Sequence, residues 1–338
     1  MSKREEPKSS LPRMPMRDAG GSFKLDNPDD GTPISAMLSL NDRLLAVTKK
    51  CTYEVQLADQ IDPKRTNPNL PHNVRRKLFD CGIESVALQK ILLQAHVLLK
   101  KEFLKIDVDQ AMTLTLDAFN AFVALDRCRD EFVKLESSAV EAYSGMSQQS
   151  RSIGLPSVGN VEQYCITFTQ KAHHFGKALL SLSRLFYPQA SNWDDLEAVV
   201  TRRFGVDDQF TALIRLIKPA LLLILHLRDS LEHKNKGVLV RDFSMEIEGS
   251  IAPPTVELDF RKSKLPRSSV SSLMKELSEA LPTYFQMILV NLASKAVQPT
   301  GGFQTLVIEL PDENQRARHV RFGYGVRMVD GGVAPLLN

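Results

Sequence analysis

The stretch that decides the fold is "VEQYCITFTQKAHHFGKALLSLSRLF", residues 161–186. Its apolar residues recur at steps of four and three without interruption: Val161, Cys165, Phe168, Ala172, Phe175, Leu179, Leu182 and Phe186. This spacing puts the apolar side chains on one face of an α-helix, and that face has to be buried against other helices. The stretch therefore predicts a helix packed in a bundle, with Asn160 as its N-cap.

Helical spacing continues on both sides of this stretch. It predicts further helices at residues 37–51, 88–98, 114–135, 192–204, 206–233 and 267–297. Between two of them lies the polar segment 143–160, which holds too few apolar residues to separate two cores. We therefore expect a mainly α-helical protein whose antiparallel bundle spans residues 34–237 as one domain.

The two ends of the chain differ from the bundle. Residues 1–33 are rich in proline, glycine, serine and charge, which predicts a disordered tail. After the bundle, four stretches show the alternation and β-branching of short strands: 237–249, 254–260, 302–311 and 317–329. We expect residues 238–338 to form a β-hairpin, a helix and two further strands, a small β appendage packed on or beside the bundle.

Composition indicates a soluble protein. Hydrophobic residues make up 43% and charged residues 25%, and the net charge of +3 demands neither a nucleic-acid nor a membrane partner. The four cysteines form no CxxC pair, which favours a reducing compartment. The first residues lack the apolar run of a signal peptide, and "PALLLILHL", residues 219–227, is too short to span a bilayer. We expect a cytoplasmic protein with no membrane partner.

The helix predicted at 206–233 carries an arginine at an apolar position. Its stripe runs through Phe210, Leu213, Ile217, Leu221 and Ile224, reaches Arg228 at the next step, and resumes at Leu231. A buried arginine without a partner is costly. Arg228 is therefore expected to pair with an acid such as Glu232, to line a cleft, or to meet another subunit.

His233 follows Arg228 with four residues between them. A histidine near the carboxyl end of a helix also interacts favourably with the helix dipole, and Gly237 is suited to stop the helix. A purely structural interpretation of both residues therefore remains open. The functional interpretation gains weight because the single Arg-x4-His match of the chain falls at the end of a bundle helix.

The hexapeptide "RDSLEH", residues 228–233, resembles the R-x4–6-H motif of HEPN domains, in which a polar residue such as Asp229 commonly follows the arginine. The resemblance covers this hexapeptide and its helical context. It implies a HEPN-like bundle that dimerises and acts as a metal-independent endoribonuclease of a toxin or defence type. Two features depart from the pattern: the late strands, and Asn235, which stands where some HEPN toxins carry a tyrosine.

The residues of the motif suit RNA cleavage without a metal or other cofactor. Histidine serves as acid or base near neutral pH, and arginine offers two donors to phosphate oxygens. We expect Arg228, His233 and Asp229 to be the catalytic residues, with Asp229 either orienting His233 or standing as a solvated surface acid. One protomer supplies one such histidine, so a homodimer would supply the second at a shared cleft.

A different class of function stays open beside this one. The bundle would then be a non-enzymatic module that binds a protein or a nucleotide, and a regulatory protein partner fits either class. Other histidines give weaker signals. His173 and His174 diverge by about 100° on one helix and cannot easily share a metal. His226, among leucines, is predicted to be a core histidine with a hydrogen-bond partner.

Overall fold

The computed structural model describes residues 31–40, 43–144, 154–234, 237–300, 302–328 and 331–336. The chain divides into two compact units, Met1–Ser85 and Val86–Asn338, which are described separately below. Helices make up 52% and strands 21% of the described residues, and these strands form four small antiparallel sheets. The protein is mixed α+β, so the prediction of a mainly α-helical bundle with a small appendage is wrong. Most of the predicted tail, residues 1–30, lies outside the described residues.

The first unit is built around an antiparallel sheet. Its strands follow each other in chain order: β1 (Ala36–Leu40), β2 (Arg43–Val47), β3 (Thr52–Leu57) and β4 (Asn73–Phe79). The short helix α1 (Ala58–Ile61) follows β3. The helix predicted over residues 37–51 is therefore wrong, and the helical bundle does not begin at residue 34.

A two-residue hairpin explains why the helical spacing misled here. Leu40 pairs with Arg43, so only the Asn-Asp pair at 41–42 lies between the strands, and such residues favour turns. In β1 the exposure alternates, with Leu38 and Leu40 buried and Met37 45% exposed. The segment is rich enough in apolar residues to match both periods, and strand pairing decides between them.

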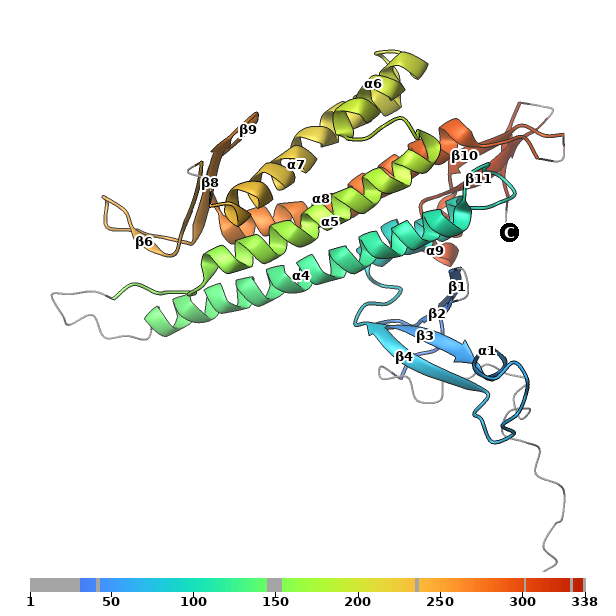
Figure 1. The fold of residues 1–338 in the computed structure, drawn as a ribbon, viewed down its shortest axis with the longest axis horizontal. Helices are drawn as coiled ribbons and strands as arrows, with labels where there is room; N and C mark the ends of the chain where they lie inside the picture. The colour runs from blue at the N-terminus through green and yellow to red at the C-terminus, as the bar shows by residue number, and fades with distance from the viewer. Residues whose placement is uncertain are drawn as a thin grey trace, which may run out of the picture. The chain divides into compact units, whose positions relative to one another are not determined.

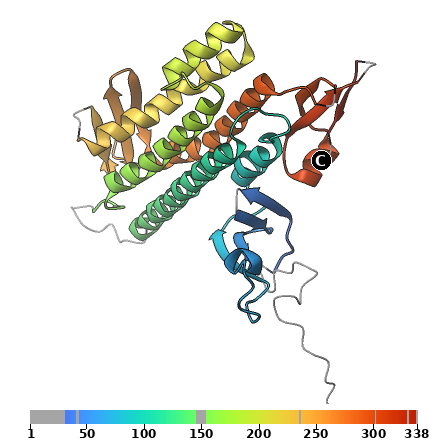
Figure 2. The same cartoon turned by 45° about the vertical axis from the view of Figure 1, so that its right-hand side comes forward.

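The second unit holds the helical bundle. The helices are α2 (Val86–Leu88), the π-turn η1 (Gln89–Leu93), α3 (Gln94–Leu98), α4 (Val108–Ser144), α5 (Val161–Phe186), α6 (Trp193–Phe204), α7 (Gln209–Glu232) and α8 (Val270–Ala296). Figures 1 and 2 show α4, α5, α7 and α8 running alongside one another. Since α4 and α5 belong to the same unit, the segment between them is not a domain boundary.

The late part of the chain contains more strands than the four predicted. Three sheets form from β5 (Val238–Arg241), β8 (Thr255–Phe260) and β9 (Ser263–Ser269); from β6 (Ser244–Met245) and β7 (Ile251–Ala252); and from β10 (Thr305–Glu309), β11 (Phe322–Arg327) and β12 (Val333–Pro335). The short helix α9 (Asp312–Arg318) joins β10 to β11. The helix α8 packs on α4, α5 and α7, so part of the predicted appendage belongs to the bundle core.

The helix α7 is the one described helix that is long and apolar enough to cross a membrane. It packs against α5, α6 and α8 as well as β9, and its aromatic and aliphatic residues Phe210, Ile214, Ile217 and Ile224 are at most 1% exposed. In its most apolar window 44% is buried inside the protein, so packing against these neighbours accounts for part of the apolar composition. The α7 helix is consistent with a soluble protein.

A buried amide network attaches the β10–β11–β12 sheet to the bundle. The Gln94 side chain, which is 0% exposed, donates from Nε2 to the carbonyl of Phe322 at 2.9 Å and accepts from the Phe322 N–H at 3.1 Å. Gln286 of α8 donates to the same Gln94 oxygen at 3.1 Å. Gln94 therefore bonds to three polar groups, two on the half-buried Phe322 backbone and one on the buried Gln286 side chain.

Replacing Gln94 by leucine is expected to lower the free energy of unfolding of the second unit by about 2–3 kcal/mol. The Phe322 backbone groups and the Gln286 amide would lose their partner, and an unsatisfied buried polar group costs about 1–3 kcal/mol. Urea unfolding followed by circular dichroism measures the change. The matched control is Gln163→Leu, at an exposed position of α5. Equal stability of the two variants would contradict the role of the network.

Candidate functional site

Arg228 lies at the edge of the buried face of α7 rather than inside it. The apolar residues of α7 that are buried near its carboxyl end are Leu221, Ile224, Leu227 and Leu231, and the polar His226 and Ser230 are buried beside them, so Leu227 occupies the stripe position expected for Arg228. The Arg228 side chain is 30% exposed, and its Nη2 lies 2.6 Å from Glu232 Oε2, one helical turn further on. Its Nη1 lies 3.2 Å from Asp229 Oδ1. The predicted ion pair with Glu232 is confirmed.

The neighbouring helix α5 contributes to the same place. Gln170 donates from Nε2 to Glu232 Oε1 at 2.8 Å, and this bond links α5 to the end of α7. His174 follows Gln170 by four residues and therefore lies on the same face of α5. His173 and His174 are both near enough to Arg228 for its charge to act on their rings. We name these six residues the Arg228 cluster: Gln170, His173, His174, Arg228, Asp229 and Glu232.

Partial burial, followed by nearby positive charge, lowers the pKa of both imidazoles and favours their neutral form. Partial burial, the Arg228 charge and the adjacent His174 lower the pKa of His173. The pKa of His174 is also lowered, by partial burial, by Lys171 and by Arg228. The bond from Gln170 and the Arg228 guanidinium lower the pKa of Glu232, so it is ionised. The cluster thus combines a guanidinium, two carboxylate side chains of which that of Glu232 is ionised, and two histidines able to accept a proton.

His233 and Asp229 are positioned differently from the prediction. His233 is the C-cap of α7 and is exposed, and its backbone N–H bonds to the Asp229 carbonyl at 3.1 Å. The Asp229 carboxylate bonds to Arg228 and, at 3.5 Å, to Arg261. Among the described residues no side-chain bond joins Asp229 to His233. Asp229 therefore orients Arg228 in this structure.

Gly237 does not terminate α7, contrary to the prediction, because the helix ends at Glu232. Lys234 adopts the left-handed conformation, with φ of 48°, that glycine commonly supplies after a helix. Gly237 instead allows a close approach of two strands, because a Cβ there would lie 2.4 Å from the Asp259 carbonyl oxygen. Gly237 thus belongs to the β5–β8 pairing.

Two further histidine predictions have a clear outcome. His226 is 7% exposed, and its Nδ1 lies 2.8 Å from Ser263 Oγ on β9, so the prediction of a core histidine with a partner is confirmed. His173 is half-buried and His174 is exposed, so His174 lies on a solvated face of α5, and the charge of Arg228 acts on both rings. In the described part of the chain, no three His, Cys, Asp or Glu side chains gather as metal ligands would.

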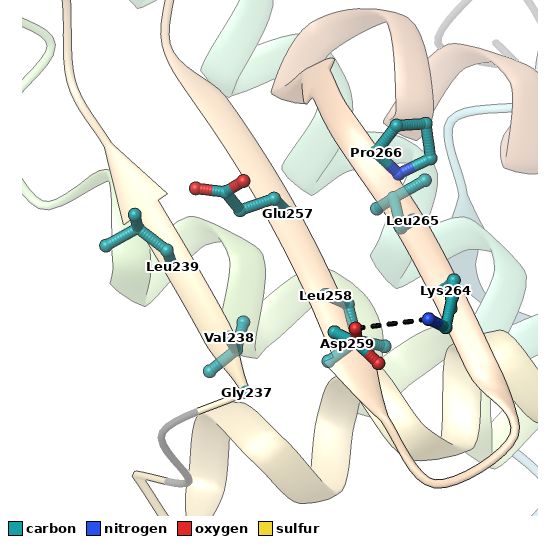
Figure 3. Close-up of a pocket in the computed structure, with 9 residues that line it drawn as sticks. All are labelled: Gly237, Val238, Leu239, Glu257, Leu258, Asp259, Lys264, Leu265 and Pro266. Carbon is teal, nitrogen blue, oxygen red and sulfur yellow. Dashed lines mark ion pairs between the residues drawn. The ribbon is translucent and has the colours of Figure 1, made fainter.

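A shallow hollow of about 490 Å³ lies on the β5–β8–β9 sheet, and Figure 3 shows its nine lining residues. Its charged residues are Glu257, Asp259 and Lys264, and Lys264 is paired with Asp259 at 3.4 Å. Glu257 lies 3.7 Å from Arg241. The hollow has no excess positive charge for a phosphate, so the Arg228 cluster is the better candidate site.

A second hollow of about 150 Å³ lies between α5 and α7, and His173 is part of its lining. It adjoins the Arg228 cluster, because His173 belongs to both. The remaining lining is mostly leucine, isoleucine and alanine side chains from the two helices, closed by Trp193 at the start of α6. The candidate site therefore combines the polar Arg228 cluster, at the carboxyl end of α7, with an apolar hollow beside it.

Comparison with known proteins gives this chain no relative: no family model, no curated protein and no solved structure matches it. The resemblance of "RDSLEH" to HEPN motifs therefore stays a prediction.

Four residues of the cluster were not predicted as site residues: Glu232, His173, Gln170 and His174. The spacing of four between Gln170 and His174 is visible in the sequence, but nothing local indicates which helix they face. Antiparallel packing of α5 on α7, with α6 between them in the chain, brings residues 170–174 to Arg228 and Glu232.

Proposed function

We propose that the protein is a metal-independent endoribonuclease whose active site is the Arg228 cluster together with His233. Arg228 binds the scissile phosphate with its guanidinium. His174 is the general base, and His233 is the general acid. Asp229 and Glu232 hold the Arg228 side chain in position.

The reaction proposed is an internal transfer within RNA. His174 takes the proton of the ribose 2′-hydroxyl, and the 2′-oxygen forms a bond to phosphorus while the bond from phosphorus to the 5′-oxygen breaks. His233 donates a proton to the departing 5′-oxygen. The products are a 2′,3′-cyclic phosphate and a 5′-hydroxyl end. Arg228 stabilises the extra negative charge on the phosphorane oxygens.

The position of His174 beside Arg228 is the observation that supports this proposal. A general base has to be neutral at the working pH, and the lowered pKa of His174 meets that condition. The lysines Lys171 and Lys177 act on the same ring, so the surroundings also attract an anion. His174 supplies the second histidine from the same chain, so the histidine count no longer requires a dimer.

The ion pairs of Arg228 favour a second candidate function. Glu232 and Asp229 already occupy the guanidinium, and a phosphate has to compete with both. An arginine with a purely structural role would form ion pairs of this kind. A non-enzymatic module that binds a protein or a nucleotide would use the Arg228 cluster for binding, without cleaving RNA.

Incubation with a mixed-sequence RNA pool distinguishes the two candidates. We expect cleavage in the presence of EDTA, because Arg228 and the two histidines supply the positive charge, the base and the acid. The new ends should be 2′,3′-cyclic phosphates and 5′-hydroxyls, detected by resistance of the 3′ ends to ligation and by direct 5′ phosphorylation. An uncut pool at micromolar protein, or cleavage that EDTA abolishes, would overturn the proposal.

The toxin or defence role rests on the HEPN resemblance alone. A homodimer with the end of α7 near its two-fold axis, a regulatory protein partner and a cytoplasmic location remain proposals as well, and the cytoplasmic location rests on composition and cysteine spacing. Light scattering at tens of micromolar protein tests the dimer.

A further inference from the structure

The hollow between α5 and α7 is large enough for one ring. We name it the Trp193 hollow; its volume is about 150 Å³, and its lining includes Leu180, Leu221, Leu222, Leu225 and Trp193. Drug-sized ligands occupy pockets of about 300–1,000 Å³, whereas an apolar cavity of about 150 Å³ accommodates benzene. The hollow therefore matches a single six-membered ring in volume.

The rim of the hollow indicates what such a ring is attached to. Lys177 and His173 line it on the α5 side, and the charge of Lys177 acts on His173, as does that of Arg228. At the other end, Asp194 is neutralised by Lys218 at 2.7 Å. The positive groups thus lie on the side of the Arg228 cluster, where a phosphate joined to the ring would be bound.

Leu222 and Leu225 are half-buried, so the hollow opens between the two helices instead of being sealed. A ring inserted from this side buries one edge against leucine side chains and leaves its other edge at the rim. The neutral imidazole of His173 can donate or accept a hydrogen bond at that rim. This arrangement suits a flat ring with polar edges, such as a nucleobase.

We propose that the Trp193 hollow binds a pyrimidine base of the nucleotide whose phosphate lies at Arg228. The proposal rests on the proposed ribonuclease function and names its substrate class: RNA cleaved next to a uridine or cytidine. A pyrimidine has the one ring that the volume accommodates, and a purine has two. The hollow thereby determines specificity while the cluster performs the chemistry.

Trp193 provides a direct test, because it is the single tryptophan of the chain and lines the hollow. Uridine 3′-monophosphate and cytidine 3′-monophosphate are titrated against its fluorescence, with adenosine 3′-monophosphate and ribose 5-phosphate as comparisons. We expect the Trp193 fluorescence to change in a saturable way with both pyrimidine nucleotides. The adenosine nucleotide should bind at least tenfold more weakly, and ribose 5-phosphate should not change the fluorescence. Equal binding of the adenosine and uridine nucleotides would overturn the proposal.

Two phenylalanine variants of α7 add a matched comparison. Leu222→Phe places a larger side chain in the hollow and is expected to weaken uridine 3′-monophosphate binding at least tenfold. Leu216→Phe changes a residue of the same helix that is 75% exposed and outside the hollow, and should bind like the wild type. Thermal midpoints establish that both variants are folded, and Leu225→Phe replaces Leu222→Phe if that variant unfolds. Unchanged binding by a folded hollow-filling variant would reject the proposal.

The binding assay separates this proposal from the enzymatic one. Pyrimidine-selective binding by a protein that leaves RNA uncut would retain the hollow as a base site and reject the nuclease. Cleavage that shows no preference for pyrimidines, with no nucleotide binding at Trp193, would retain the nuclease and reject the base site.

Discussion

Replacing Arg228 by glutamine is expected to lower the rate of RNA cleavage by at least about 100-fold, because removing one donor to a developing oxyanion costs about 100- to 1,000-fold. Glutamine keeps a polar side chain but loses the positive charge. The rate at saturating RNA is measured for the wild type and Arg228→Gln. Arg228→Lys, which retains charge without the two-pronged geometry, should recover part of the activity.

The fold should survive this change. Arg228 is 30% exposed, and an ion pair at such a position contributes at most about 1 kcal/mol. Glu232 would keep its bond from Gln170, so it is not left without a partner. The matched control is Arg215→Gln, which removes an ion pair with Glu197 at 2.9 Å elsewhere on α7 and should leave cleavage unchanged. Normal cleavage by a folded Arg228→Gln variant would reject the assignment of Arg228.

His174 and His233 are expected to be as important for RNA cleavage as Arg228. Changing either His174 or His233 to alanine should also reduce cleavage at least about 100-fold, since each performs one proton transfer and general acid–base steps contribute about 100- to 10,000-fold. The pKa of His174 is lowered below its usual value of about 6.5, so the base is deprotonated at pH 7. On the acidic side of the pH profile, the activity should therefore fall once the pH drops below that value, where His174 gains a proton. Full activity of the His174→Ala variant would contradict the assignment of His174 as the general base.

Replacing Gly82 by alanine is expected to destabilise the first unit by at least about 4 kcal/mol. A Cβ at residue 82 would lie 2.3 Å from the Thr48 carbonyl oxygen and 2.6 Å from that of Lys49. Both contacts are with backbone, which no side-chain rotation can relieve. The segment at residue 82 would have to move away from residues 48 and 49, which breaks the 2.9 Å hydrogen bond that the Ile83 N–H donates to the Thr48 carbonyl. Large losses of stability arise from such forced backbone displacement.

Hydrogen exchange of the backbone amides in β2 and β3 measures this effect, because protection there reports the local free energy of unfolding. The matched control is Gly154→Ala, at a glycine with no atom within 4 Å of an added Cβ and with no positive φ. The control should exchange like the wild type. Undiminished protection in Gly82→Ala would contradict the close packing at residue 82.

The helices of the bundle could be predicted from the sequence because helical burial is a local pattern. The stripe in residues 161–186 needs only one buried face, and α5 spans the same residues. The helices predicted at 114–135 and 192–204 correspond in the same way to α4 and α6. Each spacing identifies a helix whatever that helix packs against.

The strands of the first unit could not be assigned in this way. Leu38 and Leu40 are buried because β1 pairs with β2, and β2 in turn with β3. Pairing between strands is a property of several segments together, and the apolar residues at 37–51 match a helical period as well.

For the candidate site, the sequence by itself determined the motif residues Arg228, Asp229 and His233 and the ion pair between Arg228 and Glu232, since residues four apart on a helix are neighbours. Only the tertiary structure decided that Gln170 and His174 lie opposite them and that an apolar hollow ends at Trp193. The physical reason is the register of α5 on α7. It depends on how side chains far apart in the chain interdigitate, and no periodicity within either helix encodes that match.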